Sequence, residues 1–257
     1  MDWQASQDII EVAWSPASAS RTHFVFNRQY EAAMFHWAGA NWSQAAAANE
    51  SLGIVTMMGL DKLDHLVGLS QQWPGLVSVS VFVPGSDFHL VSVFLYYLEL
   101  CHSPALANWS IHLVFPSEHP PKTMSQVVFP RTSISCLHSP SDLVGSLVPL
   151  RPPSNIASAI PFPQNVMRNV AKSGCPSPFI TVLDGDMLPY AEFYGDVQSF
   201  LKRPTIQACA KCVYILPVFE VPSGWPLLEQ PKNKTDLIEA ITQGNAHPFY
   251  FEVLPKA

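Results

Sequence analysis

The sequence predicts an α/β protein with a mostly parallel sheet covered by helices. Apolar runs of strand length alternate with segments whose apolar residues recur at helical spacing, and this alternation is typical of parallel sheets. The chain has 257 residues, of which 48% are apolar and 13% are charged, so one domain can bury a sizeable core. Its net charge of −6 and the lack of a basic stripe argue against a nucleic-acid partner.

The first half of the alternation follows an N-terminal segment. Residues 1–50 show no sustained periodicity and are expected to be an irregular appendage. The Ala-rich stretch at 45–48 is expected to be either a helical turn or an appendage before the first strand. Leucines at helical spacing predict the first helix, and the breaker Trp73-Pro74-Gly75 ends it. Ser86 is typical of a helix N-cap. The expected elements are a strand at 52–57, a helix at 60–72, a strand at 77–83, a helix at 86–100 and a strand at 111–115.

A long connection separates these elements from the second half. Residues 116–161 are rich in Pro and Ser and are expected to form a surface loop with at most one short helix. Pro at the start and Gly at the end of the next periodic stretch favour a helix at 163–173. The remaining expected elements are a strand at 179–184, a helix at 190–202 and a strand at 212–219.

Two carboxylates, Asp184 and Asp186, stand one residue apart where the strand at 179–184 must end. Residues i and i+2 of an extended chain point the same way, so two hard oxygen ligands lie side by side, which suits Mn²⁺ or Mg²⁺. Ligands of α/β proteins bind at the carboxyl ends of strands. Asp-Gly is also an ordinary turn signal, so a plain surface turn remains the alternative interpretation.

The helix expected just before this strand carries a polar face. Asn165, Arg168 and Asn169 are spaced at i, i+3 and i+4 and therefore share one side of the helix. A polar face with one arginine, close to an acidic strand end, suits an anionic diphosphate bound through a metal ion. The hypothesis that results is a nucleotide-sugar site of the D-x-D type.

Two longer runs make a family resemblance specific. PFPQNVMRNVAKSG (161–174) and FITVLDGDMLPY (179–190) resemble the central block of the LARGE and beta-1,4-glucuronyltransferase family, glycosyltransferase family 49. Flanking segments, such as LDKLDHLVGLSQQWPGLVSVSVFVPGSD (60–87), resemble the same family in the same order. The resemblance covers residues 50–257 and implies a GT-A-type, Rossmann-like nucleotide-sugar fold over residues 51–257.

The resemblance also implies an activity. Family members transfer a sugar from a UDP-sugar to a glycan, and the expectation here is metal-dependent, inverting transfer of glucuronic acid to a xylose-containing glycan on a glycoprotein. Asp186 is expected to be the principal ligand of the metal, Mn²⁺ or Mg²⁺. Asp184 would contact the ribose or support the metal through water. Arg168 would face the diphosphate or the sugar carboxylate, with Asn165 and Asn169 orienting it.

Two further residues are weaker candidates for the site. Thr56, at the end of the first expected strand, is a candidate for the uridine pocket, although buried strand-end threonines are often structural. Glu220, which follows the strand at 212–219, would act as the general base or bind the acceptor, or would only stabilise the fold. His112 and His247 are interpreted as core or surface histidines.

An alternative function stays open beside the enzyme. Family members continue beyond the position of Ala257, and that part is expected to hold acceptor-binding residues, the base and a histidine that completes the metal site. The GT-A fold is therefore expected to be incomplete at its C-terminus. The alternative is an inactive fragment or pseudoenzyme that binds a nucleotide sugar or a partner glycosyltransferase.

The compartment is indicated by sequons and cysteines. Glycosylation sequons occur at Asn41, Asn49, Asn108 and Asn233, an excess that hints at a lumenal protein. In such a protein Cys101 and Cys136 can form a disulfide, and the resemblance supports that pair. The pair Cys209 and Cys212 lacks the context of a zinc or redox site and is interpreted as structural or incidental.

The resemblance implies a type II membrane protein of the Golgi lumen. Residues 1–20 have neither the basic start nor the apolar core of a signal peptide. The most apolar run, at 91–100, is too short to span a bilayer. An anchor is therefore expected from the family but is not visible in these residues.

Overall fold

In a computed structural model, the described residues are 9–13, 23–26, 29–47, 52–121, 124–130, 134–152, 159–209, 211–222, 225 and 231–249. The chain divides into two compact units, Met1–Met187 and Leu188–Ala257. The first unit contains the main sheet, and the second contains short helices and a two-stranded ribbon.

The main sheet of the first unit has the strand order β2-β3-β6-β5-β4-β8. Neighbouring strands β6, β5, β4 and β8 are parallel, whereas β3 runs antiparallel to both β6 and β2. The predicted α/β class with a mostly parallel sheet is therefore confirmed. The sheet strands are β2 (His23–Phe26), β3 (Tyr30–Ala38), β4 (Leu52–Gly59), β5 (Leu76–Phe82), β6 (Trp109–Pro116) and β8 (Phe179–Val182).

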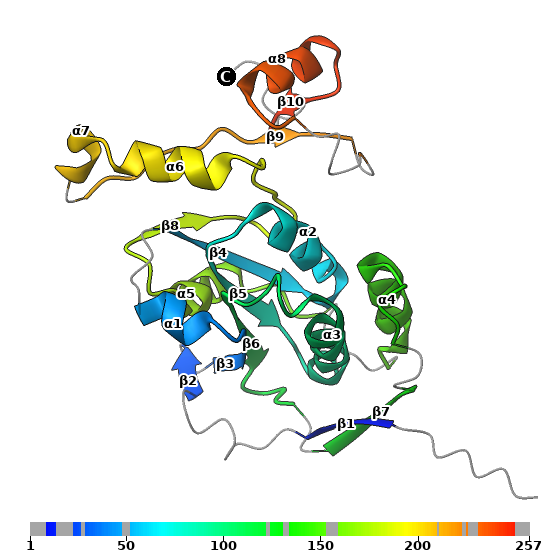
Figure 1. Cartoon of the computed structure of the whole chain (residues 1–257). Coiled ribbons are helices and arrows are strands. Elements are labelled where there is room, and N and C mark those ends of the chain that lie inside the picture. The colour runs from blue at the N-terminus through cyan, green and yellow to red at the C-terminus, as the bar shows by residue number, and fades with distance from the viewer. Residues whose placement is uncertain are drawn as a thin grey trace, which may run out of the picture. The chain divides into compact units, whose positions relative to one another are not determined.

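The direction of each strand crossover decides which face of the sheet a helix covers. From β4 through β5 to β6 the chain moves one way across the sheet, and right-handed crossovers then place α2 and α3 on one face. The step from β6 back to β8 runs the other way and places α5 on the opposite face (Figure 1). The connecting helices are α2 (His65–Gln72), α3 (Asp87–His102), α4 (Pro140–Leu147) and α5 (Gln164–Gly174), with short 3-10 turns η1 (Leu60–Lys62) and η3 (Val148–Leu150).

Strand β5 shows how the sequence alternation is used. Its valines and serines point to opposite faces, and all of its residues are buried. A buried hydroxyl needs a hydrogen-bond partner: Ser78 Oγ donates to the carbonyl of Ala171 at 2.7 Å and Ser80 Oγ donates to that of Met167 at 2.9 Å. These two bonds hold α5 against the sheet and so help to position the helix that carries Arg168.

His112 of β6 belongs to the same buried layer. Its side chain is fully buried and its Nε2 lies 2.9 Å from Ser78 Oγ and 3.3 Å from Ser110 Oγ. Ser78 already donates its only hydroxyl hydrogen to Ala171, so Nε2 carries a proton and donates to Ser78. Burial lowers the pKa of His112 to about 3, which makes it a neutral core residue, one of the two roles expected for it.

The described part of residues 1–50 is not irregular, contrary to the expectation. Strand β3 (Tyr30–Ala38) is an integral part of the main sheet and pairs with β6, while β2 extends the sheet beyond it. Helix α1 (Trp42–Ala47) follows β3 and includes Ala45, Ala46 and Ala47 of the Ala-rich stretch. The sequence of β3, YEAAMFHWA, mixes aromatic residues, which favour strands, with alanine and glutamate, which are depleted in them. Local propensity is therefore mixed, and pairing with β6 decides the conformation.

Other expected bounds also change. The long connection at 116–161 contains the expected short helix, α4, but also a strand, β7 (Met124–Pro130), which pairs with β1 (Ile9–Ala13) in a separate ribbon. The helix expected at 60–72 is divided into η1 and α2. Strand β7 pairs with β1, which lies more than a hundred residues earlier in the chain. The residues next to β7 in the sequence therefore do not indicate this pairing.

The second unit contains α6 (Phe193–Leu201), α7 (Pro204–Gln207), β9 (Phe219–Glu220), α8 (Lys234–Thr242) and β10 (His247–Pro248). The strand expected at 212–219 is wrong in extent, because only Phe219 and Glu220 pair, with β10. Val213 and Ile215 are each 93% exposed. Pro217 interrupts this run and has no N–H to donate, which disfavours sheet pairing.

Candidate functional site

The strand order creates a natural binding position. Starting at β4, the sheet grows through β5 to β6 in one direction, and β8 is then added on the other side of β4. The order therefore reverses between β4 and β8. In open α/β sheets, ligands bind at such a switch point, in the crevice outside the carboxyl ends of the strands.

A cavity of about 360 Å³ lies at this position. It is lined from one side by the end of β4 with the following turn η1, and from the other by the loop after β8. The start of α5 adds a third wall. The lining residues are Met57, Met58, Gly59, Asp61, Lys62, Phe162, Gln164, Asp184, Gly185 and Asp186.

The loop that carries the two aspartates is held closely to β4. The amide of Leu183 still donates to Val55 at 3.0 Å, and the amide of Met187 donates to Asp184 at 2.9 Å, which closes a turn around the D-x-D triplet. Gly185 lies so near the end of β4 that a Cβ on it would be 2.7 Å from the carbonyl oxygen of Met57. Glycine is needed here because the two backbones approach closely.

Arg168 and Asp184 form a contact that the sequence analysis did not predict, and the expected role of Arg168 toward the donor stays a prediction. Arg168 Nη2 donates to Asp184 Oδ1 at 2.8 Å, and each side chain is 38% exposed. Arg168 Nε is buried and has no hydrogen-bond partner among the described residues. Asn165 and Asn169 are exposed and do not line the cavity, whereas their neighbour Gln164 does. The roles of these two asparagines remain predictions.

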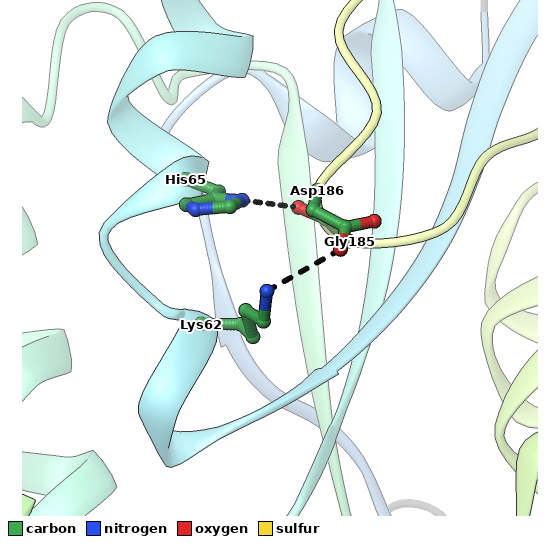
Figure 2. A network of polar contacts seen from close by, with 4 residues as sticks. All are labelled: Lys62, His65, Gly185 and Asp186. Atoms are coloured by element: carbon green, nitrogen blue, oxygen red, sulfur yellow. Dashed lines mark hydrogen bonds and ion pairs between the residues drawn. The ribbon is translucent and has the colours of Figure 1, made fainter. Parts of the chain in front are cut away.

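Figure 2 shows two contacts on the loop that sequence reasoning missed. Lys62 Nζ, at the end of η1, lies 3.3 Å from Asp186 Oδ2, and His65 Nδ1, in the first turn of α2, lies 3.2 Å from the carbonyl oxygen of Gly185. A carbonyl oxygen only accepts, so Nδ1 of His65 carries a proton and donates. The sequence did offer one indication of Lys62 and His65: residues 60–65 directly follow the first parallel strand, where ligands of α/β proteins bind.

The two weaker candidates, Thr56 and Glu220, belong to different units. Thr56 is only 2% exposed and does not line the cavity, and its hydroxyl has no partner among the described residues. Its assignment to a uridine pocket therefore stays a prediction. Glu220 is an exposed residue of β9 in the second unit, and its role as base or acceptor contact likewise stays a prediction.

The two carboxylates fit a divalent cation only as part of a ligand set. Each has one oxygen paired with a cationic side chain, and its second oxygen accepts no hydrogen bond from the described residues. No third Asp, Glu, His or Cys within the described ranges joins them in a cluster that would hold a metal. Mg²⁺ commonly binds through one or two carboxylates together with substrate phosphates and water. The donor set therefore fits a cation that binds together with a diphosphate.

The cysteines form two disulfides. Cys101 at the end of α3 is joined to Cys136, the pair that the resemblance implies, and Cys209 is joined to Cys212. Cys175 is free, and burial raises the pKa of its thiol.

The four sequons differ in their surroundings. Asn41 and Asn233 are exposed, and Asn49 lies outside the described residues. Asn108 Nδ2 donates to the carbonyl of Pro74 at 3.0 Å, and Ser110 of its sequon is buried in β6. Glycosylation at all four sites stays a prediction. Among the described residues, no helix has both the length and the apolar character needed to cross a bilayer.

Comparison with known proteins identifies the family. A family model described as a glycosyl-transferase for dystroglycan matches residues 51–257. The chain belongs to this glycosyltransferase family. The resemblance seen in the sequence motifs is thereby confirmed, and the sheet with its switch-point cavity agrees with a GT-A-like fold.

Relatives in the family are glucuronyltransferases and xylosyltransferases by name. Beta-1,4-glucuronyltransferase 1 of Danio rerio is 27% identical over 79% of this chain and 46% of the relative, and that of Homo sapiens is 26% identical over 77% and 46%. The xylosyl- and glucuronyltransferase LARGE2 of Mus musculus is 20% identical over 79% of this chain and 23% of its own length. The chain thus spans about half of the length of the glucuronyltransferases that it matches, and less of LARGE2.

Proposed function

We propose that this chain is the donor-binding part of a glycosyltransferase that uses Mn²⁺ or Mg²⁺ to transfer a sugar from a UDP-sugar to a glycan, with inversion. The observation that carries the proposal is the cavity at the switch point between β4 and β8, which Asp184 and Asp186 line together. Family membership supports the reaction class. The names of the relatives support glucuronic acid as the sugar.

The charges around the cavity explain why a cation is needed. Asp61, Asp184 and Asp186 contribute three negative charges to the lining, and Lys62 contributes one positive charge. An anionic diphosphate would be repelled from such a surface. A divalent cation supplies Lewis-acid stabilisation of the departing nucleoside diphosphate. Asp186 is the proposed main ligand, and Asp184 supports the metal or contacts the ribose.

Other residues that line the cavity or contact its lining have separate proposed tasks. Arg168, held by Asp184, directs its guanidinium group toward the diphosphate or the carboxylate of the donor sugar, because guanidinium pairs well with planar and tetrahedral anions. Phe162 and Met57 provide an apolar wall against which a flat or weakly polar part of the donor can pack. With a divalent cation on the acidic loop, the loop and the apolar wall together match an anionic donor that has an apolar face.

The acceptor and the compartment are proposed from family membership. The family description names dystroglycan, and we infer a xylose-containing glycan on a glycoprotein of that kind as the acceptor. Glu220 is a candidate base or acceptor contact. We infer a Golgi-lumen location, as a type II membrane protein, from the family. The sequons and the Cys101–Cys136 and Cys209–Cys212 disulfides, which persist in oxidising compartments, support a lumenal location.

The test is calorimetric titration of the 257-residue chain with UDP, first with Mn²⁺ and then with a chelator. UDP binding is expected only with Mn²⁺, and Asp186→Asn is expected to abolish it. Ser173→Ala, an exposed change on α5 outside the cavity, is the matched control. Binding that persists in the chelator or in Asp186→Asn would remove the D-x-D loop from the proposed site.

A second candidate function has one observation in its favour. Within the described residues the loop offers only two carboxylates to a metal, and both already have cationic partners. This arrangement supports a pseudoenzyme or inactive fragment that binds a nucleotide sugar, or a partner glycosyltransferase, without turnover. Transfer of glucuronic acid to a xyloside by the 257-residue chain would exclude it. Mn²⁺-dependent UDP binding without any transfer would favour it.

A further inference from the structure

The segment Leu60–His65 makes two contacts of different kinds with the D-x-D loop (Figure 2). Lys62 forms an ion pair with Asp186, and His65 donates a hydrogen bond to the backbone of Gly185. Both residues follow β4, and the loop follows β8, so the contacts bridge the two strands at the switch point. One contact involves a candidate metal ligand, and the other does not.

The ion pair between Lys62 and Asp186 is weak enough for another cation to replace Lys62. Lys62 is 46% exposed and Asp186 is 53% exposed, and the two atoms are 3.3 Å apart. Exposed pairs of this kind are weak because solvent screens them and because a long lysine side chain loses conformational freedom in forming them. A divalent cation that approaches Asp186 Oδ2 meets the ammonium group of Lys62 at the same oxygen. The two cations therefore compete for one carboxylate.

Lys62 remains in the cavity when it leaves Asp186. It lines the same cavity as both aspartates, and its flexible stem allows the ammonium group to move without a backbone change. A diphosphate that enters with the metal brings new anionic oxygens into that space. Meanwhile the hydrogen bond from His65 to Gly185 does not involve the carboxylates, so it keeps the loop in place during the exchange.

We propose, on the basis of the proposed function, that Lys62 is an exchangeable counter-ion of the D-x-D loop. It pairs with Asp186 in the absence of metal and contacts the diphosphate of the donor once a divalent cation takes Asp186. Lys62 thus weakens the binding of metal alone and strengthens the binding of the metal–nucleotide pair. His65 is a positioning residue for the same loop.

The experiment measures two affinities for wild type and for Lys62→Gln. Mn²⁺ alone is titrated by calorimetry or electron paramagnetic resonance, and UDP is titrated at saturating Mn²⁺. Lys62→Gln is expected to bind Mn²⁺ about two- to fivefold more tightly, the range expected from loss of an exposed ion pair. It is expected to bind UDP about tenfold more weakly, through loss of a charge-assisted hydrogen bond. A merely structural effect of Lys62→Gln would not strengthen Mn²⁺ binding and weaken UDP binding at the same time.

Two control variants separate position from net charge. Lys172→Gln removes an exposed lysine from the last turn of α5, outside the cavity, and is expected to change neither affinity. Lys62→Arg keeps the charge and is expected to restore the wild-type order of affinities. Thermal melting verifies that each variant folds. Equal effects of Lys172→Gln and Lys62→Gln would overturn the proposal in favour of a net-charge effect.

The remaining outcomes distinguish this inference from the proposed function. Mn²⁺ binding that Asp186→Asn abolishes but Lys62→Gln leaves unchanged or weakens would overturn the role of Lys62 and leave the metal site standing. Tighter Mn²⁺ binding with unchanged UDP affinity would overturn the contact with the diphosphate. If neither wild type nor Lys62→Gln binds Mn²⁺ even in the presence of UDP, both this inference and the proposed metal dependence are overturned.

Discussion

Arg168 Nη2 donates a hydrogen bond to Asp184 Oδ1 at 2.8 Å, which ties the middle of α5 to the loop after β8. The buried bonds from Ser78 and Ser80 hold α5 on the sheet. The position of Arg168 beside the D-x-D loop therefore follows from the packing of its helix. The guanidinium group and both aspartates reach one place because crossovers of opposite direction meet at β4 and β8.

Arg168→Ala is expected to weaken UDP binding at saturating Mn²⁺ by more than about 1 kcal/mol, because a charge-assisted hydrogen bond to the diphosphate is lost. Calorimetry measures the change. Lys172→Ala, on the exposed side of the same helix, is the control and is expected to bind UDP as wild type does. Unchanged affinity in a folded Arg168→Ala variant would remove Arg168 from the site.

Gly185→Ala is expected to weaken Mn²⁺-dependent UDP binding without unfolding the protein. A methyl group here would meet the Met57 carbonyl oxygen at 2.7 Å and the Met58 side chain at 3.1 Å, so the exposed loop must move away from β4. Gly145→Ala, where no atom lies within 4 Å of the added carbon, is the control. If Gly185→Ala binds UDP as tightly as wild type, the place of the loop against β4 is not needed for binding.

Gly174→Ala is expected to destabilise the protein by about 1–3 kcal/mol, the usual range for overpacking a well-filled core. The new methyl group would overlap the ring of His112, which hydrogen bonds to Ser78 and Ser110 hold in place. Denaturant unfolding measures the difference. Gly195→Ala in α6 meets no neighbouring atom and is expected to be neutral or slightly stabilising. Similar stabilities for the two variants would contradict the close packing at Gly174.

Acid is expected to destabilise the fold through His112. Burial lowers its pKa to about 3 in the folded protein, against 6.5 for the ordinary side chain, so between these values the unfolded chain binds more protons. The contribution of His112 to the free energy of unfolding is therefore fully present above pH 6.5 and decreases as the pH drops below that value. The loss approaches 1.4 kcal/mol per pH unit, or about 2 kcal/mol by pH 5.

Denaturant unfolding at about pH 7.5 and pH 5 measures this loss of stability. His112→Asn is expected to lower stability at both values but to reduce its dependence on pH. The control is His138→Asn, which changes an exposed histidine outside the buried network. An undiminished pH dependence in His112→Asn would assign the acid sensitivity to other groups.

Loss of the Cys101–Cys136 disulfide is expected to destabilise the first unit. The bond closes a loop with a sequence separation of 35 residues, and the chain-entropy model predicts a loss of about 4 kcal/mol. Cys101→Ala/Cys136→Ala is compared with wild type by thermal unfolding under non-reducing conditions. Cys175→Ala, which removes the free cysteine, is the control. A melting temperature equal to that of wild type would show that the cross-link contributes little.

Local sequence patterns were sufficient to predict the helices and strands that carry a clear propensity or spacing signal. Pro and Gly at the two ends of α5 predict that helix, the valine and serine alternation predicts β5, and the i, i+3, i+4 spacing predicts the face that carries Arg168. They failed for β3, whose residues have mixed strand propensity. They also failed for 212–217, which has a strand-like composition but no strand partner among the described residues. A strand forms only when another strand pairs with it, and the local sequence does not show which strand that will be.

The sequence by itself determined the chemistry of the site, which is two carboxylates one residue apart at a strand end, with an arginine on the preceding helix. Only the tertiary structure decided what surrounds that chemistry. It placed Lys62 and His65 on the D-x-D loop across 124 and 120 residues of chain, and it kept Thr56 out of the cavity. Residues so far apart meet because β4 and β8 are neighbours in the sheet, and hydrogen bonding between strands sets that adjacency.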